Sequence, residues 1–115
     1  MLTINQEGKI LTQVKITVLK RFGPVDVFGP NHNIKGLSGN LITKCSLFEE
    51  GAEFIVDNIE RIPEGFCGWA WRDIYKDLSV LFFDGNFYRP EKGMAYVSCT
   101  DGRKPVVFKL ERMED

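Results

Sequence analysis

The 115-residue sequence lacks an apolar run of the length, about 18–20 residues, that a membrane-spanning helix requires. Its apolar runs are strand-sized, as at residues 80–83. The first residues also lack the basic segment followed by an apolar core that marks a secretory signal. We therefore expect a cytoplasmic protein that does not contact a membrane and whose cysteines stay reduced.

An excess of charge of either sign is also absent. Lysine and arginine total 15 and aspartate and glutamate total 16, so the formal net charge is −1. This balance excludes the global basic field that holds a nucleic-acid backbone and the acidic excess typical of disordered chains. Segments that mix basic and aromatic residues, such as residues 20–22 and 87–89, are therefore interpreted as core packing rather than as a nucleic-acid surface.

Residue combinations that carry catalysis or bind metals are scarce. His32 is the single histidine, so any Cys–His nucleophilic pair must use it. Cys45, Cys67 and Cys99 are 22 and 32 residues apart, whereas structural zinc sites usually have closely spaced ligands. The glycines match no nucleotide-binding motif. The sequence therefore identifies no cofactor, and a metal site would need a fold that gathers the three thiols, with or without His32.

The sequence does contain enough apolar material for one core. Apolar residues make up 43% of the chain and aromatic residues 12%, a composition that favours pleated, half-buried strands. The length fits one domain, which typically has about 100–200 residues, and no glycine- or proline-rich linker divides it. We expect a single domain over residues 14–115, preceded by an N-terminal arm or edge strand at residues 1–13.

Alternating apolar and polar residues predict strands at residues 14–22 and 53–57. A short apolar run predicts a further strand at residues 80–83. Residues 23–44, rich in glycine, proline and asparagine, are predicted to form a long irregular connection. Connections of this length usually have a function, are mobile or are held by a partner.

The C-terminal segment predicts a β-hairpin. An Asp-Gly dipeptide at positions 101–102 lies between two alternating runs at residues 94–99 and 105–111, which is a strong hairpin signal. We expect a four-residue loop closed by Cys99 and Lys104. The facing pairs in this register are Val97 with Val106, Ala95 with Phe108, and Ser98 with Pro105. Cys99 then lies on the apolar face and points toward the core.

One helix is predicted at residues 69–78, because its apolar residues recur at the spacing of one helical face. These residues are Trp71, Ile74, Tyr75 and Leu78. We expect the helix to cover an apolar face of the sheet, with contacts among Trp71, Ile74, Tyr75, Ile16, Val18, Val97, Val106 and Phe108. The predicted fold is therefore α+β, a curved and mostly antiparallel sheet of about five strands with one short helix.

Cys67 directly precedes the predicted helix. A thiol at a helix N-terminus meets unpaired backbone N–H groups and the positive end of the helix dipole, and both favour the reactive thiolate. The alternative is a buried thiol that packs beside Trp69 or Trp71, since free cysteine is among the most buried residue types. The sequence leaves both interpretations open.

Four segments of the sequence form a joint pattern. They read VKITVLKR at residues 14–21, CSLFEEGAEF at 45–54, PEGFCGWAWRDI at 63–74 and CTDGRKPVVFKLE at 99–111. Together they resemble a small family of uncharacterised prokaryotic proteins, over residues 14–112. The resemblance implies recurring cysteines at positions 45, 67 and 99, and it brings no established activity or ligand. Members often have a further cysteine in place of Ser98 and a proline in place of Ser46, so the resemblance argues against a four-cysteine site in this chain.

Three hypotheses about function follow. The first is a non-enzymatic ligand-binding or protein-interaction module, with a second copy of the chain as one candidate partner and exposed apolar residues along the long loops. The second is a redox or metal-binding protein that uses Cys67 with Cys45 or Cys99, and it predicts that two of these sulfurs lie close together. The third is a small enzyme. The residues expected around its pocket are Cys67, Trp69, Asp73 and Arg103.

Overall fold

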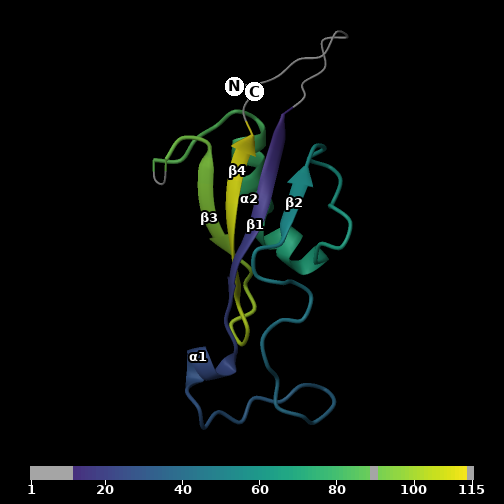
Figure 1. Ribbon diagram of the computed structural model, residues 1–115, viewed down its shortest axis with the longest axis vertical. Coiled ribbons are helices and arrows are strands. Elements are labelled where there is room, and N and C mark those ends of the chain that lie inside the picture. The colour runs from purple at the N-terminus through teal and green to yellow at the C-terminus, as the bar shows by residue number, and fades with distance from the viewer. Residues whose placement is uncertain (1–11, 89–90, 114–115) are drawn as a thin grey trace.

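The computed structural model describes residues 12–88 and 91–113 and has an α+β architecture (Figure 1). Its elements, in chain order, are β1 (Gln13–Arg21), α1 (Pro24–Phe28), β2 (Glu53–Val56), α2 (Gly68–Phe82), β3 (Met94–Ser98) and β4 (Val106–Met113). The predicted arm at residues 1–13 lies, apart from its last two residues, outside the described part of the chain.

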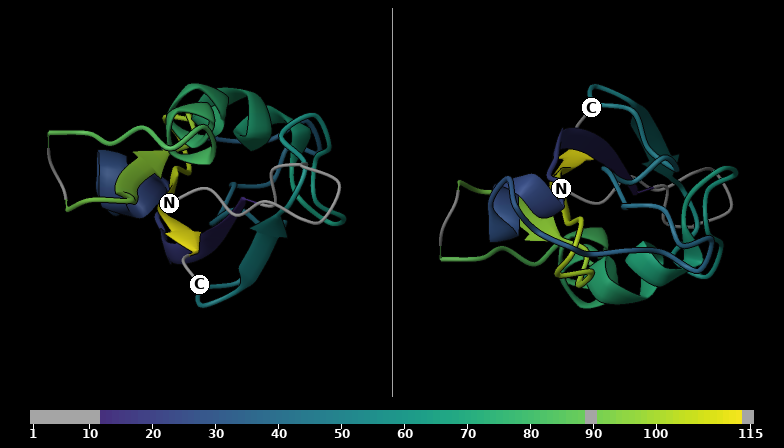
Figure 2. Two further views of the ribbon diagram at one scale, coloured as in Figure 1. Left: turned by 90° about the horizontal axis from the view of Figure 1, so that it is seen from above. Right: turned by 90° about the horizontal axis from the view of Figure 1, so that it is seen from below.

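Four antiparallel strands form one sheet in the order β2-β1-β4-β3. The long strands β1 and β4 are central, and the shorter β2 and β3 form the edges. Helix α2 lies on one side of the sheet, as the views from above and below show (Figure 2). Helix α1 and the connection after it lie apart from this two-layer body (Figure 1).

The core lies between α2 and the sheet, because alternate residues of the central strands point toward the helix. The buried strand residues are Val14, Ile16 and Val18 of β1 and Val106, Phe108 and Leu110 of β4. The buried residues of α2 are Ala70, Ile74, Leu78, Leu81 and Phe82. Each large apolar side chain that leaves water completely contributes about 1.5–3 kcal/mol, so this layer dominates the stability of the fold.

The opposite face of the sheet is exposed and mixes ion pairs with apolar residues such as Ile55 and Tyr96. Lys15 of β1 lies between Glu53 of β2 and Glu111 of β4, with Nζ–Oε distances of 3.6 and 3.8 Å. Lys109 pairs with the same Glu111 at 3.4 Å. Exposed ion pairs of this kind contribute at most about 1 kcal/mol each, so the burial of the other face, rather than these pairs, sets the strand register.

The prediction of a strand at residues 80–83 is wrong. Most of this segment forms the last turn of α2, which is 15 residues long, and the sheet has four strands rather than about five. A short apolar run does not distinguish a strand from a buried helical turn. Here Leu81 and Phe82 continue the buried stripe of α2 beyond Leu78. The helix ends before Asp84, which adopts a left-handed conformation with φ 70°.

The helix itself is confirmed, but its buried face differs from the predicted one. Ile74 is completely buried, Trp71 packs partly against the core, and Tyr75 stays 36% exposed. The extra turn adds Leu81 and Phe82 to the apolar stripe and moves Tyr75 away from its centre. None of the helices in the described part of the chain is long and apolar enough to cross a membrane.

The β-hairpin is confirmed, but its register is shifted by two residues from the prediction. Val97 faces Phe108 rather than Val106, and every other predicted pair moves by the same amount. The loop is longer than four residues, because the N–H of Cys99 donates to the carbonyl of Val106 (3.0 Å) and leaves residues 100–105 outside the ladder. A shift of two residues keeps each side chain on its predicted face, so Cys99 still lies on the core side.

The predicted irregular connection contains the short helix α1. Its start is stabilised locally, because the N–H of Gly23 donates to Oδ2 of Asp26 (2.7 Å) and Pro24 occupies a first-turn position where no N–H partner is needed. Further along, a single bridge pairs Lys35 with Leu41. The rest of the connection is irregular, as predicted.

Arg112 of β4 fastens the end of α2 to the sheet. Its buried guanidinium donates to the carbonyl oxygens of Leu81 (3.0 Å) and Gly85 (2.8 Å), and to Oδ1 of Asn86 (2.9 Å). Its Nε also lies 3.7 Å from a carboxylate oxygen of Asp84. Carbonyl groups at the end of a helix lack partners within the helix, so Arg112 acts as a charged C-terminal cap.

We expect Arg112→Met to lower the free energy of unfolding by about 3 kcal/mol, because it removes charge-assisted hydrogen bonds to buried acceptors. Urea denaturation followed by circular dichroism measures this change. Lys76→Met, which replaces a highly exposed cation of α2, is the matched control and should change the free energy by less than about 0.5 kcal/mol. Equal stability of the two variants would contradict the role assigned to Arg112.

Candidate functional site

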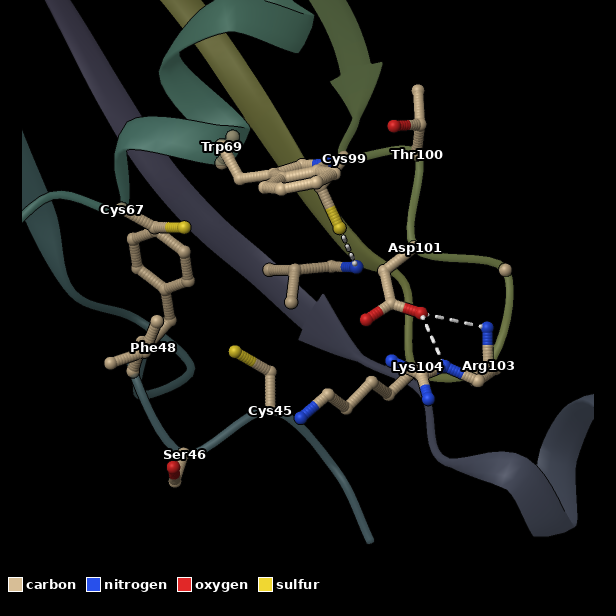
Figure 3. A pocket seen from close by; sticks show the side chains of 14 residues that line it. Cys45, Ser46, Phe48, Cys67, Trp69, Cys99, Thr100, Asp101, Arg103 and Lys104 are labelled. Carbon is tan, nitrogen blue, oxygen red and sulfur yellow. Dashed lines mark hydrogen bonds and ion pairs between the residues drawn. The ribbon is translucent and has the colours of Figure 1, made fainter. Parts of the chain in front are cut away.

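Three segments that are distant in the sequence enclose an open cavity of about 530 Å³ (Figure 3). They are residues 45–48 before β2, the start of α2, and the loop between β3 and β4. Five of the six residues singled out from the sequence line this cavity: Cys45, Cys67, Cys99, Trp69 and Arg103. The fold therefore brings all three cysteines to one place, which their spacing in the sequence does not reveal.

Cys45 lies on a segment that the core holds in place. Phe48, only 3% exposed, packs edge-on against Phe66 and Phe108, with ring centroids 5.0 and 5.1 Å away. Arg21 of β1 donates from Nη1 to the carbonyl oxygen of Cys45 (2.9 Å). The Cys45 side chain is half-buried, and Figure 3 shows its sulfur pointing into the cavity.

Cys67 is the N-cap residue of α2, as its position before the predicted helix indicates. Its carbonyl accepts the N–H of Trp71 (2.9 Å), and its side chain makes no capping hydrogen bond. Gly65, with φ 80°, turns the chain before it, and Phe66 anchors the turn in the core. The half-buried thiol thus packs against the core on one side and lines the cavity on the other.

Cys99 follows β3 and lies on the core side of the sheet. Its Sγ accepts a hydrogen bond from the N–H of Val106 (3.2 Å) across the hairpin. It is half-buried, like Cys45 and Cys67, and all three are free thiols. The cavity wall that Cys99 forms is therefore hydrogen-bonded to β4 directly beyond the end of β3.

Asp73, expected near the pocket, does not line the cavity itself but is hydrogen-bonded to Thr100, which does. Its Oδ2 accepts hydrogen bonds from the N–H (2.8 Å) and the hydroxyl group (3.0 Å) of Thr100, the first residue of the β3–β4 loop. This contact joins the second turn of α2 to the loop. Asp73 is a positioning residue that holds one cavity wall against the helix.

Trp69, in the first turn of α2, forms another wall. Its side chain is 63% exposed, whereas tryptophan side chains are largely buried on average. The guanidinium of Arg72 lies 4.8 Å from the ring centroid, a cation–π contact that restrains the indole. A large aromatic surface is thereby held at the edge of the cavity.

The β3–β4 loop carries three charged residues into the site. Oδ1 of Asp101 accepts the backbone N–H of Arg103 (3.0 Å) and lies 3.4 Å from Nε of the same residue. Partial burial acts to raise the pKa of Asp101, but the hydrogen bonds from Arg103 and the charges of Arg103 and Lys104 outweigh it, so the pKa lies below its ordinary value. Asp101 is ionised at neutral pH and is paired with Arg103.

Lys104 is the site residue that sequence reasoning missed. It is half-buried, lines the cavity, and forms no ion pair with any residue that the structure describes. Figure 3 shows its side chain reaching across the cavity toward Cys45. The sequence signal that could have pointed to Lys104 is the pair of adjacent cations, Arg103 and Lys104, shortly after Cys99. No sequence pattern shows which of these two cations forms an ion pair with a carboxylate.

His32 is not brought to the cavity. Its Nδ1 accepts the N–H of Ile34 (3.2 Å) within the connection after α1. In residues 12–88 and 91–113, no group of three or more His, Cys, Asp and Glu side chains is arranged so that it could hold a metal ion. The three cysteines share a cavity without forming such a group.

A second exposed surface lies on α1 and the connection that follows it. Its large exposed apolar residues are Val25, Val27, Phe28, Leu37 and Leu41. These side chains lie along the long loop, where an interaction module is expected to expose apolar residues, and none of them lines the cavity. A homodimer stays a prediction, because the structure contains one chain.

Comparisons of this chain with protein-family models, with curated proteins and with solved structures found no match. The resemblance drawn from the four sequence segments therefore stays a prediction. The geometry of the cavity is the basis for the function proposed below.

We expect Asp73→Ala to free the β3–β4 loop from α2, because the variant loses both hydrogen bonds to Thr100. The backbone amide of Thr100 should lose its protection from hydrogen exchange, and the free energy of unfolding should fall by about 1 kcal/mol. Asp77→Ala, on the same helix, is the control and should leave the amide of Thr100 protected. Unchanged protection in Asp73→Ala would contradict the positioning role.

Proposed function

We propose that this protein is a non-enzymatic binding module whose cavity takes a small organic anion with an apolar body. The observation that carries the proposal is Lys104, a half-buried residue that lines the cavity and forms no ion pair with a carboxylate among the described residues. A cation that has no ion-pair partner at the wall of a cavity can form a charge-assisted contact with an anionic ligand.

The charge balance within the cavity supports this choice. Asp101 is the single carboxylate among the lining residues, and it is already hydrogen-bonded to Arg103. The cavity therefore carries one net positive charge, from Lys104. Because the wall of a cavity has a lower effective dielectric constant than water, this charge acts on a ligand more strongly than a surface lysine does.

The remaining walls suit an apolar group. Phe48, Val106 and Trp69 line the cavity with aliphatic and aromatic surface, and a thiol behaves as a small apolar group with weak hydrogen-bonding capacity. The volume of about 530 Å³ lies within the range of about 300–1,000 Å³ found for small-molecule sites. A ligand with a planar apolar body and one acidic group matches both the shape and the charge.

The same residues favour binding over catalysis. His32 is not among the residues that line the cavity, so the described lining holds no Cys–His pair of the kind that thiol hydrolases use. Asp101, the lining carboxylate, has a lowered pKa and is a weak base for proton abstraction. The metal-binding alternative has no group of suitable side chains in the described ranges to support it.

Titration with anilinonaphthalene sulfonate, a fluorescent aromatic anion, tests the proposal. We expect saturable binding that Lys104→Met weakens about tenfold, because removal of one partly desolvated charge contact costs about 1.4 kcal/mol or more. Lys104→Arg should retain most of the affinity, because it keeps the positive charge in the cavity.

Lys76→Met is the matched control, since it removes an exposed cation of α2 that does not line the cavity. It should leave the affinity for the dye within about twofold of wild type. Equal dye binding by wild type, Lys104→Met and Lys76→Met would contradict the proposal and would place the dye on another apolar surface.

A further inference from the structure

The three half-buried thiols of the cavity differ in their surroundings. Cys99 is part of the sheet wall, and its sulfur is engaged by the N–H of Val106. Cys67 lies between the anchored Phe66 and the first turn of α2. Cys45, in contrast, lies on the segment before β2, where it precedes Ser46 and the 63% exposed Leu47, and no hydrogen bond engages its sulfur among the described residues.

The positively charged side chain of Lys104, which has no ion-pair partner among the described residues, extends toward Cys45 (Figure 3). Figure 3 shows the side chain of Lys104 pointing toward Cys45, while Arg103 is held by Asp101. A reagent that carries acidic groups would be drawn to Lys104, and its reactive atom would then lie next to the sulfur of Cys45. The cavity has room for such a reagent beside the thiol.

We infer that Cys45 is a site of reversible thiolation by small anionic disulfides, and that this modification closes the cavity to its ligand. The second half of the inference rests on the proposed binding function. In the forward step, the thiolate of Cys45 attacks one sulfur of the disulfide, and a new S–S bond forms as the old one breaks. The other half of the reagent leaves as a thiolate, which takes up the proton that Cys45 released.

No oxidant other than the small disulfide is needed, because one disulfide bond is exchanged for another. A small free thiol reverses the step by the same chemistry. The group attached to Cys45 would occupy the space between Cys45 and Lys104 and would neutralise the ammonium charge. A thiolated cavity therefore loses both the room and the charge that the proposed ligand needs.

The test is incubation of the full-length native protein with oxidised glutathione, an anionic disulfide, or with cystamine, a cationic one, followed by intact-mass and peptide mass spectrometry. We expect one glutathionyl group on Cys45, formed at least about tenfold faster than the cystamine adduct, because Lys104 attracts the anionic reagent. Lys104→Met should remove this preference, and Cys45→Ser should prevent the adduct.

Cys67→Ser and Cys99→Ser are the matched controls, and both should still be modified at Cys45. Denaturation in urea should make all three thiols reactive, which shows that the reagents are competent. Modification of native protein mainly at Cys67 or Cys99, absence of any adduct, or equal rates with both reagents would overturn the inference.

Dye binding separates this inference from the proposed function. Unmodified wild type should bind anilinonaphthalene sulfonate, whereas glutathionylated wild type should lose at least about tenfold in affinity, through loss of the cavity charge. Normal dye binding with no thiolation overturns the thiolation and leaves the binding function standing. Charge-dependent thiolation of Cys45 without dye binding overturns the binding function alone.

Discussion

The packing of Phe108 against two phenylalanines from other segments is the interaction on which the site depends. Phe108 is completely buried on β4, and its ring centroid lies 5.1 Å from that of Phe48 and 5.6 Å from that of Phe66. Phe48 fixes the segment that carries Cys45, and Phe66 fixes the turn that carries Cys67. Without this aromatic cluster, the cavity would have only its sheet wall.

The cavity forms where the core ends. Toward the middle of the sheet, α2 covers the strands and buries them; at the hairpin end, the helix begins and leaves the β3–β4 loop partly uncovered. The hydrogen bonds between Asp73 and Thr100 join that loop to the helix. An apolar interior and a charged loop therefore meet within one small volume, which is the usual composition of a small-molecule site.

The sequence predicted those features that depend on local pattern. Alternation located β1 and β2, and the position of Cys67 before the helix made it the N-cap residue. The face of Cys99 was also predictable, because a register error of two residues does not change the side on which a residue lies.

The features that depend on tertiary packing were not predictable. Residues 80–83 are mainly helical because Leu81 and Phe82 are buried in the core as part of α2, which their local sequence does not encode. The β3–β4 loop is held by a contact between residues 27 positions apart, Asp73 and Thr100. Likewise, Lys104 has no ion-pair partner among the described residues because Asp101 pairs with Arg103. Which of the two adjacent cations pairs with Asp101 depends on the conformation of the folded loop.

The central claim is that an anionic ligand binds between residues 45–48, the start of α2 and the β3–β4 loop. Amide proton–nitrogen correlation spectra recorded during titration with anilinonaphthalene sulfonate test it most directly. The account predicts that the largest shift changes fall on Cys45, Trp69 and Lys104 and their neighbours. Shift changes confined to α1 and residues 29–44, with the three cavity segments unchanged, would contradict it.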